Sequence, residues 1–411
     1  MTSQNNKASY VTLLICGIIA IPACIMVFTR ISPDPVLGVL IFGLGIVGAA
    51  FLISWAAEAA QVDISASFAI AILALIAILP EYAVEAVLAW DAGQSYILGQ
   101  GATIEMERVA ANVTGANRLL IGLGWSSVIL IFYLRKRESL NLKGILNLEI
   151  LMLIIANLVL ILIVILGQIP ITLGFGLIIL YVIYLWLSSI KESGEPELVG
   201  PSLAIGRQRK TARRIIVIGL FLYSAFIILL IAEPFVHALV ESGKTLGIDE
   251  FILIQWLAPL ASESPEIIIA ILFTLRSNAV AGLTILISAE VNQLTLLVGS
   301  MVGIFSLSFG ELTSFPLNDM QSIEFVLTAA VTFLGLIFLA PRIIGWKAGA
   351  TLLILFVAHL FFTEQYIANT WFGYEESGMW LFDRAIFTYI YLSIATCCGT
   401  KYVYRRINRN R

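Results

Sequence analysis

The chain has 411 residues, of which 60% are hydrophobic and only 12% are charged, and its mean hydropathy is +0.97. This composition excludes an ordinary water-soluble domain, so most of the chain must lie in a lipid bilayer. The formal net charge of −3 at pH 7 says little by itself, and we expect no nucleic-acid partner.

Apolar segments long enough to cross a bilayer, which takes about 20 residues in a helix, recur along the whole chain. They predict about twelve transmembrane helices, at residues 10–29, 35–59, 64–90, 101–133, 145–166, 169–190, 214–240, 248–275, 279–310, 322–340, 344–362 and 382–403. The longest segments carry polar interruptions, which is typical of tilted or broken helices. The first segment lacks an early basic cluster and a clear cleavage site, so we interpret it as a retained helix.

The basic residues divide unequally between the two sides of the predicted membrane. If the N-terminus is cytoplasmic, most of the 24 Lys and Arg residues fall in cytoplasmic segments. The segments on the opposite side hold only Arg30, Arg108, Lys244 and Arg384. Cytoplasmic loops are enriched in Lys and Arg, so this division predicts that both termini are cytoplasmic. We expect a multi-pass protein of the cell (plasma) membrane.

A basic linker containing Gly and Pro divides the chain near its middle. The predicted segments are an extra helix (1–34), a five-helix block (35–190), a cytoplasmic linker (191–213), a second five-helix block (214–362) and a last helix with a basic tail (363–411). The blocks align at Asn117-Arg-Leu-Leu-Ile-Gly-Leu-Gly and Asn292-Gln-Leu-Thr-Leu-Leu-Val-Gly. Because five is odd, the two blocks enter the membrane in opposite orientations. The sequence thus predicts an all-α integral membrane protein with two inverted five-helix repeats, which contain broken helices, and one extra helix at each end.

Each block contains a Pro-Glu pair within a predicted span. The first reads Ile-Leu-Pro-Glu and ends at Glu81, and the second reads Glu-Ser-Pro-Glu and ends at Glu266. An ionisable residue at this depth is costly and therefore indicates a functional site. Proline also leaves backbone carbonyls without their helical partners, and oxygen atoms of both kinds are ligands for Ca²⁺. The alternative is a pair of structural glutamates that are neutralised by a base such as Arg118.

Five further side chains are candidates for the same cation site. Glu263 lies three residues before Glu266, and Glu85 lies four after Glu81, so each shares a helical face with its partner. Their alternative is a protonated carboxyl that bonds a neighbouring helix. Asn117 and Asn292 are matched between the repeats, although asparagine also joins membrane helices structurally. Ser262 could add a hydroxyl oxygen, although membrane serines usually bond their own helix.

Other charged residues receive weaker interpretations. Glu290 falls on a different helical face from Asn292 and needs a partner of its own. Arg118 would repel a cation unless a carboxylate balances it, and we hypothesise that Glu85 or Glu290 does so. For Glu58 and Asp63, which lie at a membrane boundary, solvated charge is the default reading.

No cofactor is indicated. The four cysteines, Cys16, Cys24, Cys397 and Cys398, show no metal-ligand spacing and are interpreted as packing residues. The two histidines are far apart in sequence, and no nucleotide or catalytic-triad motif is recognisable.

The residues quoted above resemble the sodium/calcium exchanger family, within the cation/Ca²⁺ exchanger superfamily. Its two inverted repeats each carry a Gly-Thr-Ser-Leu-Pro-Glu-like helix, matched here by 77–81 and 261–266. The helix that follows carries a Gly-Asn-x-x-Gly-Ser-Asn-like stretch, matched weakly by 111–117 and 288–292. The resemblance covers about 35–362 and implies that Glu81 and Glu266 bind Ca²⁺. The Thr-Ser pair, which helps to bind Na⁺ in that family, is replaced by Ala77 and Ile78 and by Ser262 and Glu263.

The sequence therefore predicts a secondary active antiporter, not an enzyme, that exchanges Ca²⁺ for Na⁺ or H⁺ by alternating access at a site near the membrane midplane. The gain of Glu263 and the loss of hydroxyls favour H⁺. The predicted partners are inorganic cations and the lipid bilayer, and a homo-oligomer stays open. Two alternatives also stay open: an intramembrane enzyme that depends on carboxylates or a metal, and a degenerate ion sensor without transport.

Overall fold

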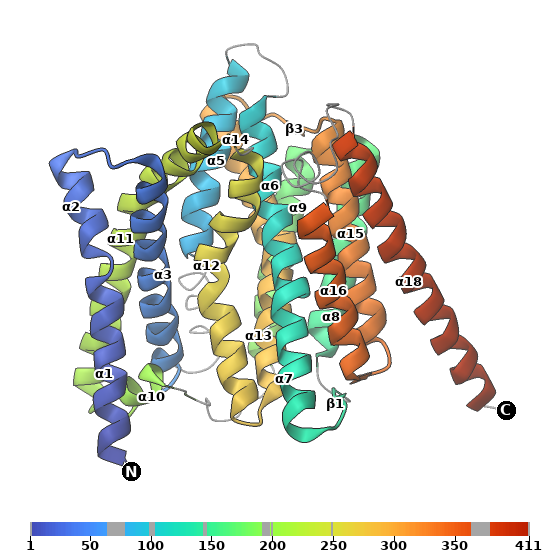
Figure 1. Ribbon diagram of the computed structural model, residues 1–411, viewed down its shortest axis with the longest axis horizontal. Coiled ribbons are helices and arrows are strands. Elements are labelled where there is room, and N and C mark those ends of the chain that lie inside the picture. Colours follow the sequence, from blue (N-terminus) through green and yellow to red (C-terminus); the bar gives the residue numbers. More distant parts are fainter. Residues whose placement is uncertain are drawn as a thin grey trace. The chain divides into compact units, whose positions relative to one another are not determined.

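The computed structural model describes residues 2–63, 79–97, 103–142, 146–190, 198, 200–247, 250–362 and 379–409. Within these ranges, nine helices are long and apolar enough to cross a membrane, and Trp346–Phe362 is a shorter apolar helix. The protein is an almost entirely helical, multi-span membrane protein (Figure 1). The predicted span at 64–90 lies outside the described residues up to residue 78.

The helices agree closely with the predicted spans. The first half contains α1 (Thr2–Ile18), α2 (Ile21–Thr29), α3 (Pro35–Ala60), α5 (Leu79–Ile97), α6 (Ile104–Leu119), η1 (Leu120–Trp125), α7 (Ser126–Lys136), α8 (Asn147–Leu166) and α9 (Ile171–Ile190). The second half contains α10 (Pro201–Gly206), α11 (Lys210–Leu246), α12 (Glu250–Leu275), α13 (Ala279–Asn292), η2 (Gln293–Leu297), α14 (Val298–Phe309), α15 (Asp319–Leu339), α16 (Trp346–Phe362) and α18 (Met379–Arg409). The first predicted span differs, because it is divided into α1 and α2 just before Pro22.

Two compact units divide the chain, and each draws on both halves of the sequence. Unit 1 comprises Met1–Leu88 and Val182–Ile269, and unit 2 comprises Ala89–Tyr181 and Ala270–Arg411. Helices α5, α9 and α12 contribute to both units. The two halves of the sequence are therefore packed into each other rather than folded as separate bodies.

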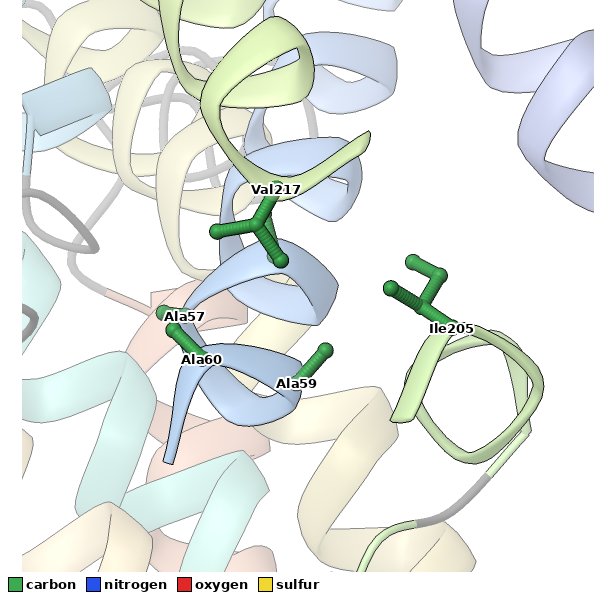
Figure 2. Close-up of a cluster of buried hydrophobic side chains, with 6 residues drawn as sticks. Ala57, Ala59, Ala60, Ile205 and Val217 are labelled. Carbon is green, nitrogen blue, oxygen red and sulfur yellow. The ribbon is translucent and has the colours of Figure 1, made fainter. Parts of the chain in front are cut away.

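The core of unit 1 is the antiparallel pair α3 and α11, which lie side by side in Figure 1. Glycine and alanine on α3 let the helices approach closely, as is common in membrane interiors. A methyl group at Gly48 would lie 2.5 Å from the Cys16 carbonyl oxygen, so α1 packs directly on the α3 backbone. At the C-terminal end of α3, Ala57, Ala59 and Ala60 form an apolar cluster with Val217 of α11 and Ile205 of α10 (Figure 2).

The inverted repeat is visible in unit 2 as matched irregularities. The helix α6–α7 is interrupted by the π-helical turn η1, and its counterpart α13–α14 is interrupted by the π-helical turn η2. Each of these long helices ends before a two-residue strand, β1 (Leu140–Asn141) or β3 (Phe315–Pro316). Strand β1 pairs with β4 (Ile343–Ile344), and β3 pairs with β2 (Gln168–Ile169), both antiparallel. Each pairing joins a strand of one repeat to a strand of the other, as an approximate two-fold relation between the repeats requires.

Candidate cation-binding site

Most of the predicted ligands lie on α5 and α12 in unit 1. The described part of helix α5, Leu79–Ile97, contains Pro80 and Glu81. Glu81 and Glu85 follow one turn apart on the same face. Helix α12 is continuous and contains Pro259 and Pro265. The second Pro-Glu pair thus interrupts the hydrogen-bond ladder of its helix without ending the helix.

Glu81 lies among other carboxyl groups. Its side chain lies beside that of Glu263, and it also interacts electrostatically with Glu266 and Glu85. Glu81, Glu85 and Glu263 are all at least 95% buried. Carboxyl groups this close together and this deeply buried repel one another when ionised, so the cluster is suited to bind either a cation or protons. These side chains thus lie near one another within unit 1, and their role as cation ligands stays a prediction.

Helix α3 adds two residues to this group that the sequence did not assign to it. Glu266 is hydrogen-bonded to the Ser54 hydroxyl and interacts electrostatically with Glu58 and Glu263. The second carboxyl oxygen of Glu266, Oε2, is buried and has no hydrogen-bond partner among the described residues. Glu58 also accepts a hydrogen bond from Ser202 of α10. It is therefore bound into the fold, contrary to the default of a solvated charge.

The polar backbone and hydroxyl groups near Pro265 are largely engaged within α12. Proline at 265 removes the N–H that would otherwise bond the Ala261 carbonyl, and the Ser264 hydroxyl donates to that oxygen at 3.4 Å. The Ser262 hydroxyl donates to the Ala258 and Pro259 carbonyls, each at 3.3 Å. Ser262 thus adopts the local bonding pattern that is usual for membrane serines. Its oxygen can still accept or ligate through a lone pair.

Asn117 and Asn292 lie in unit 2, each just before a π-helical turn. The Asn117 amide nitrogen donates to Glu290 Oε1 at 2.9 Å. The Thr332 hydroxyl lies 3.2 Å from Asn117 Oδ1 and 3.3 Å from Glu290 Oε1. Asn117, Glu290 and Thr332 thus join α6, α13 and α15 in a fully buried polar group. Glu290 thus has partners of its own, Asn117 and Thr332, which the sequence pattern did not indicate.

The hypothesis that Arg118 is balanced by Glu85 or Glu290 is wrong. Its guanidinium forms a buried ion pair with Glu324 of α15 and also donates to the Thr114 carbonyl and hydroxyl. Arg384 of α18 bonds the other oxygen of Glu324. His359 of α16 lies 3.5 Å from Arg118 Nη1. The positive charge of Arg118 is thus paired with Glu324.

The candidate ligands are thus distributed between the units. Glu81, Glu85, Ser262, Glu263 and Glu266 belong to unit 1, whereas Asn117 and Asn292 belong to unit 2. Among the described residues, no three His, Cys, Asp or Glu side chains are arranged to hold one metal ion. The donor set of unit 1, with several carboxyls and a hydroxyl, nevertheless has the all-oxygen chemistry that Ca²⁺ prefers.

Comparison with known proteins gives consistent results. The family model described as sodium/calcium exchanger protein matches residues 35–190 and 216–363. The crystal structure of the H⁺/Ca²⁺ exchanger CAX is similar, with 35% sequence identity, 98% of each chain covered and a TM-score of 0.84. YfkE is similar in fold, at 17% identity over 86% of this chain and 98% of its own, with a TM-score of 0.61. So is the sodium-calcium exchanger NCX_Mj, at 16% identity over 79% and 98%, with a TM-score of 0.51. No curated protein matches the chain.

Proposed function

This chain belongs to the sodium/calcium exchanger protein family, and on that premise we propose that it is a secondary active antiporter that exchanges Ca²⁺ for H⁺ by alternating access. Ca²⁺ and protons would compete for the carboxyl groups of Glu81, Glu263 and Glu266. Competition for one set of ligands couples the two fluxes, because the site carries either the metal ion or protons.

The cluster of buried carboxyl groups around Glu81 is the observation that carries this proposal. Glu81 interacts with Glu263, Glu266 and Glu85, and Glu266 interacts with Glu263. Carboxylates crowded together in a buried site repel one another, and either a bound cation or bound protons would balance their charge. Ca²⁺ that binds to this cluster would therefore compete with protons for the same groups.

Two observations favour H⁺ over Na⁺ as the counter-ion. The related chain with 35% identity over nearly its full length is an H⁺/Ca²⁺ exchanger. In addition, the first repeat has Ala77 and Ile78 where the family has hydroxyls, and Ser262 of the second repeat already bonds its own helix. Exchange for Na⁺ remains the alternative, and the same experiment distinguishes the two.

The remaining predicted residues receive supporting roles. We assign Asn117 and Asn292 to the wall of the ion pathway next to the π-helical turns, and Glu85 to the polar path beyond Glu81. The five segments 1–34, 35–190, 191–213, 214–362 and 363–411 would be arranged with both termini and the linker in the cytoplasm. The distribution of basic residues supports this orientation, and we propose the plasma membrane as the location.

Ion flux into vesicles containing the purified protein tests the proposal. A Ca²⁺ reporter inside the vesicles would be read under an imposed H⁺ gradient and, separately, under a Na⁺ gradient. We expect Ca²⁺ uptake driven by the H⁺ gradient, and loss of that uptake in Glu81→Gln and in Glu266→Gln. Glu233→Gln is the matched control, because the Glu233 side chain is 73% exposed. Uptake that persists in both site variants would refute the proposal.

The same vesicles address the other functional classes. Uptake driven only by the Na⁺ gradient would make the protein a Na⁺/Ca²⁺ exchanger. Binding of Ca²⁺ without flux under either gradient would favour an ion sensor. Turnover of a lipid substrate by the purified protein would favour an intramembrane enzyme, although the matched relatives are exchangers.

A further inference from the structure

A groove of about 490 Å³ opens in unit 1 between α2, α3 and α11. Because Gly38, Gly43 and Gly45 of α3 face Ala238, Phe235 and Ile231 of α11 in reverse order, the two helices are antiparallel here. One end of the groove is therefore formed by the loop between α2 and α3, with Arg30, Ser32 and Glu241. The other end reaches Met26 and Phe42, so the groove is polar at the loop and apolar further along the helices.

The sequence of α11 places this groove at the level of the lipid headgroups. Residues 215–232 of α11 carry no charged side chain, and this stretch nearly suffices to cross the hydrocarbon of a bilayer. The next four turns carry Glu233, His237, Glu241 and Lys244. The groove is lined by Pro234, His237, Ala238 and Glu241 of this charged part. It therefore lies where α11 leaves the hydrocarbon.

Arg30 is suited to hold an anion at the polar end. It caps the C-terminus of α2 with a left-handed backbone, φ 55°, where glycine would be the unstrained choice. No described acidic side chain forms an ion pair with Arg30, and Glu241 is paired with Lys244 at 2.7 Å. The side chains beside the groove on α2, Ile25 and Phe28, are exposed and apolar. The groove is thus continuous with a surface that faces lipid.

We propose that this groove binds one glycerophospholipid, whose phosphate pairs with Arg30 and whose acyl chain lies against Met26, Val27 and Phe42. Charge complementarity selects the phosphate, and the apolar end of the groove selects the chain. The bound lipid would fill the space between the extra helix α2 and the α3–α11 pair. This proposal is independent of which ions the protein exchanges.

Native mass spectrometry of the full chain in detergent, titrated with phosphatidylglycerol, tests the proposal. We expect one retained lipid in the wild type and about tenfold weaker retention in Arg30→Gly, since a charge-assisted contact is lost. Glycine fits the left-handed backbone, so this variant should fold. Ala238→Trp should fill the groove and abolish retention. Arg209→Gln, at the opposite end of α11, is the control and should bind like the wild type.

Two further arms make the outcome decisive. Diacylglycerol, which lacks the phosphate, should bind more weakly than phosphatidylglycerol, and millimolar inorganic phosphate should not displace the lipid. Thermal unfolding in detergent verifies that each variant is folded. If Ala238→Trp does not fold, the result for Arg30→Gly alone tests the proposal. Equal lipid retention by the wild type, Arg30→Gly and Arg209→Gln would overturn the proposal. So would equal binding of diacylglycerol and phosphatidylglycerol.

Discussion

The amide nitrogen of Asn117 donates a hydrogen bond of 2.9 Å to Glu290, and so joins the two repeats of the chain inside unit 2. Both residues are completely buried. No water is available to replace a polar contact at this depth. Removing one partner therefore leaves the other buried without that hydrogen bond, which lowers the stability of the fold.

We expect Asn117→Ala to lower the free energy of unfolding by about 1–3 kcal/mol, because Glu290 would lose its shortest hydrogen bond in a buried site. Glu290→Gln should cost less, since an amide can still bond Asn117. Thermal unfolding in detergent of each variant measures the loss. Thr332→Val, which removes only the two longer contacts, is the matched control. A loss for Asn117→Ala no larger than that for Thr332→Val would contradict the stabilising role of this contact.

Glu324→Gln should be the more damaging change. Arg118 and Arg384 both bond the buried carboxylate of Glu324, so the variant would leave two buried guanidinium groups facing a neutral amide. Breaking a buried ion pair costs about 3–5 kcal/mol. The measurement is again unfolding in detergent, with Thr388→Val as the control, because the Thr388 hydroxyl bonds only its own helix at Arg384. A loss no larger than that of the control would contradict the role of this cluster in fixing α18.

Asp63 provides a prediction about pH, because it follows α3 and lies outside the membrane span. The hydrogen bonds from Arg213, at 2.7 Å to each carboxyl oxygen, hold the pKa of Asp63 below its ordinary value. A carboxyl whose pKa is lower in the folded state stabilises the fold above its unfolded pKa, which is about 3.9. This stabilisation is lost as the pH falls through the lowered folded value.

We therefore expect Asp63→Asn to destabilise the protein by about 1 kcal/mol at pH 7, a modest value for a pair near the surface. The difference from the wild type should shrink as the pH falls below about 4. Unfolding curves between pH 3 and pH 7 measure it. Arg214→Gln is the control, since Arg214 is 53% exposed and lies 3.7 Å from the same carboxylate. A difference that does not change with pH would show that the Asp63 charge is not responsible.

Glu263→Gln tests whether Glu263 binds protons in the proposed exchange. The amide has nearly the same size as the carboxyl group, so the protein should fold, but the site loses one titratable ligand. We expect the apparent affinity for Ca²⁺ to fall on the order of tenfold and the pH dependence of uptake to change. Flux into vesicles at several pH values measures both, with Glu233→Gln as the control. An unchanged pH profile would remove Glu263 from the proton-binding group.

Local sequence patterns predicted much of this fold, for identifiable reasons. The apolar spans predicted the helices because a bilayer demands long apolar segments, and Pro80–Glu81 and Pro265–Glu266 stood out because charge is rare within such segments. The resemblance between the two blocks predicted the inverted repeat. The assignment of the seven candidate ligands to a cation site stays a prediction.

Other features depend on how helices are rotated against each other, and this is not readable from one sequence. The pairing of Arg118 with Glu324 and Arg384 joins residues from three helices that are distant in the chain. The contact between Glu266 and Ser54 likewise required the packing of α3 on α12. The π-helical turns η1 and η2 were not predicted, because one extra residue in a helical turn leaves the apolar pattern of the sequence almost unchanged.

The interleaving of the two sequence halves has a consequence for assembly. Each unit contains segments from before and after the linker, and the strand pairs β1–β4 and β2–β3 bond one half of the chain to the other. Covalent continuity at the linker therefore contributes little to holding the halves together. If the chain is divided just before Gly200 and the two polypeptides are made separately, they should associate in the membrane and reconstitute the intact protein.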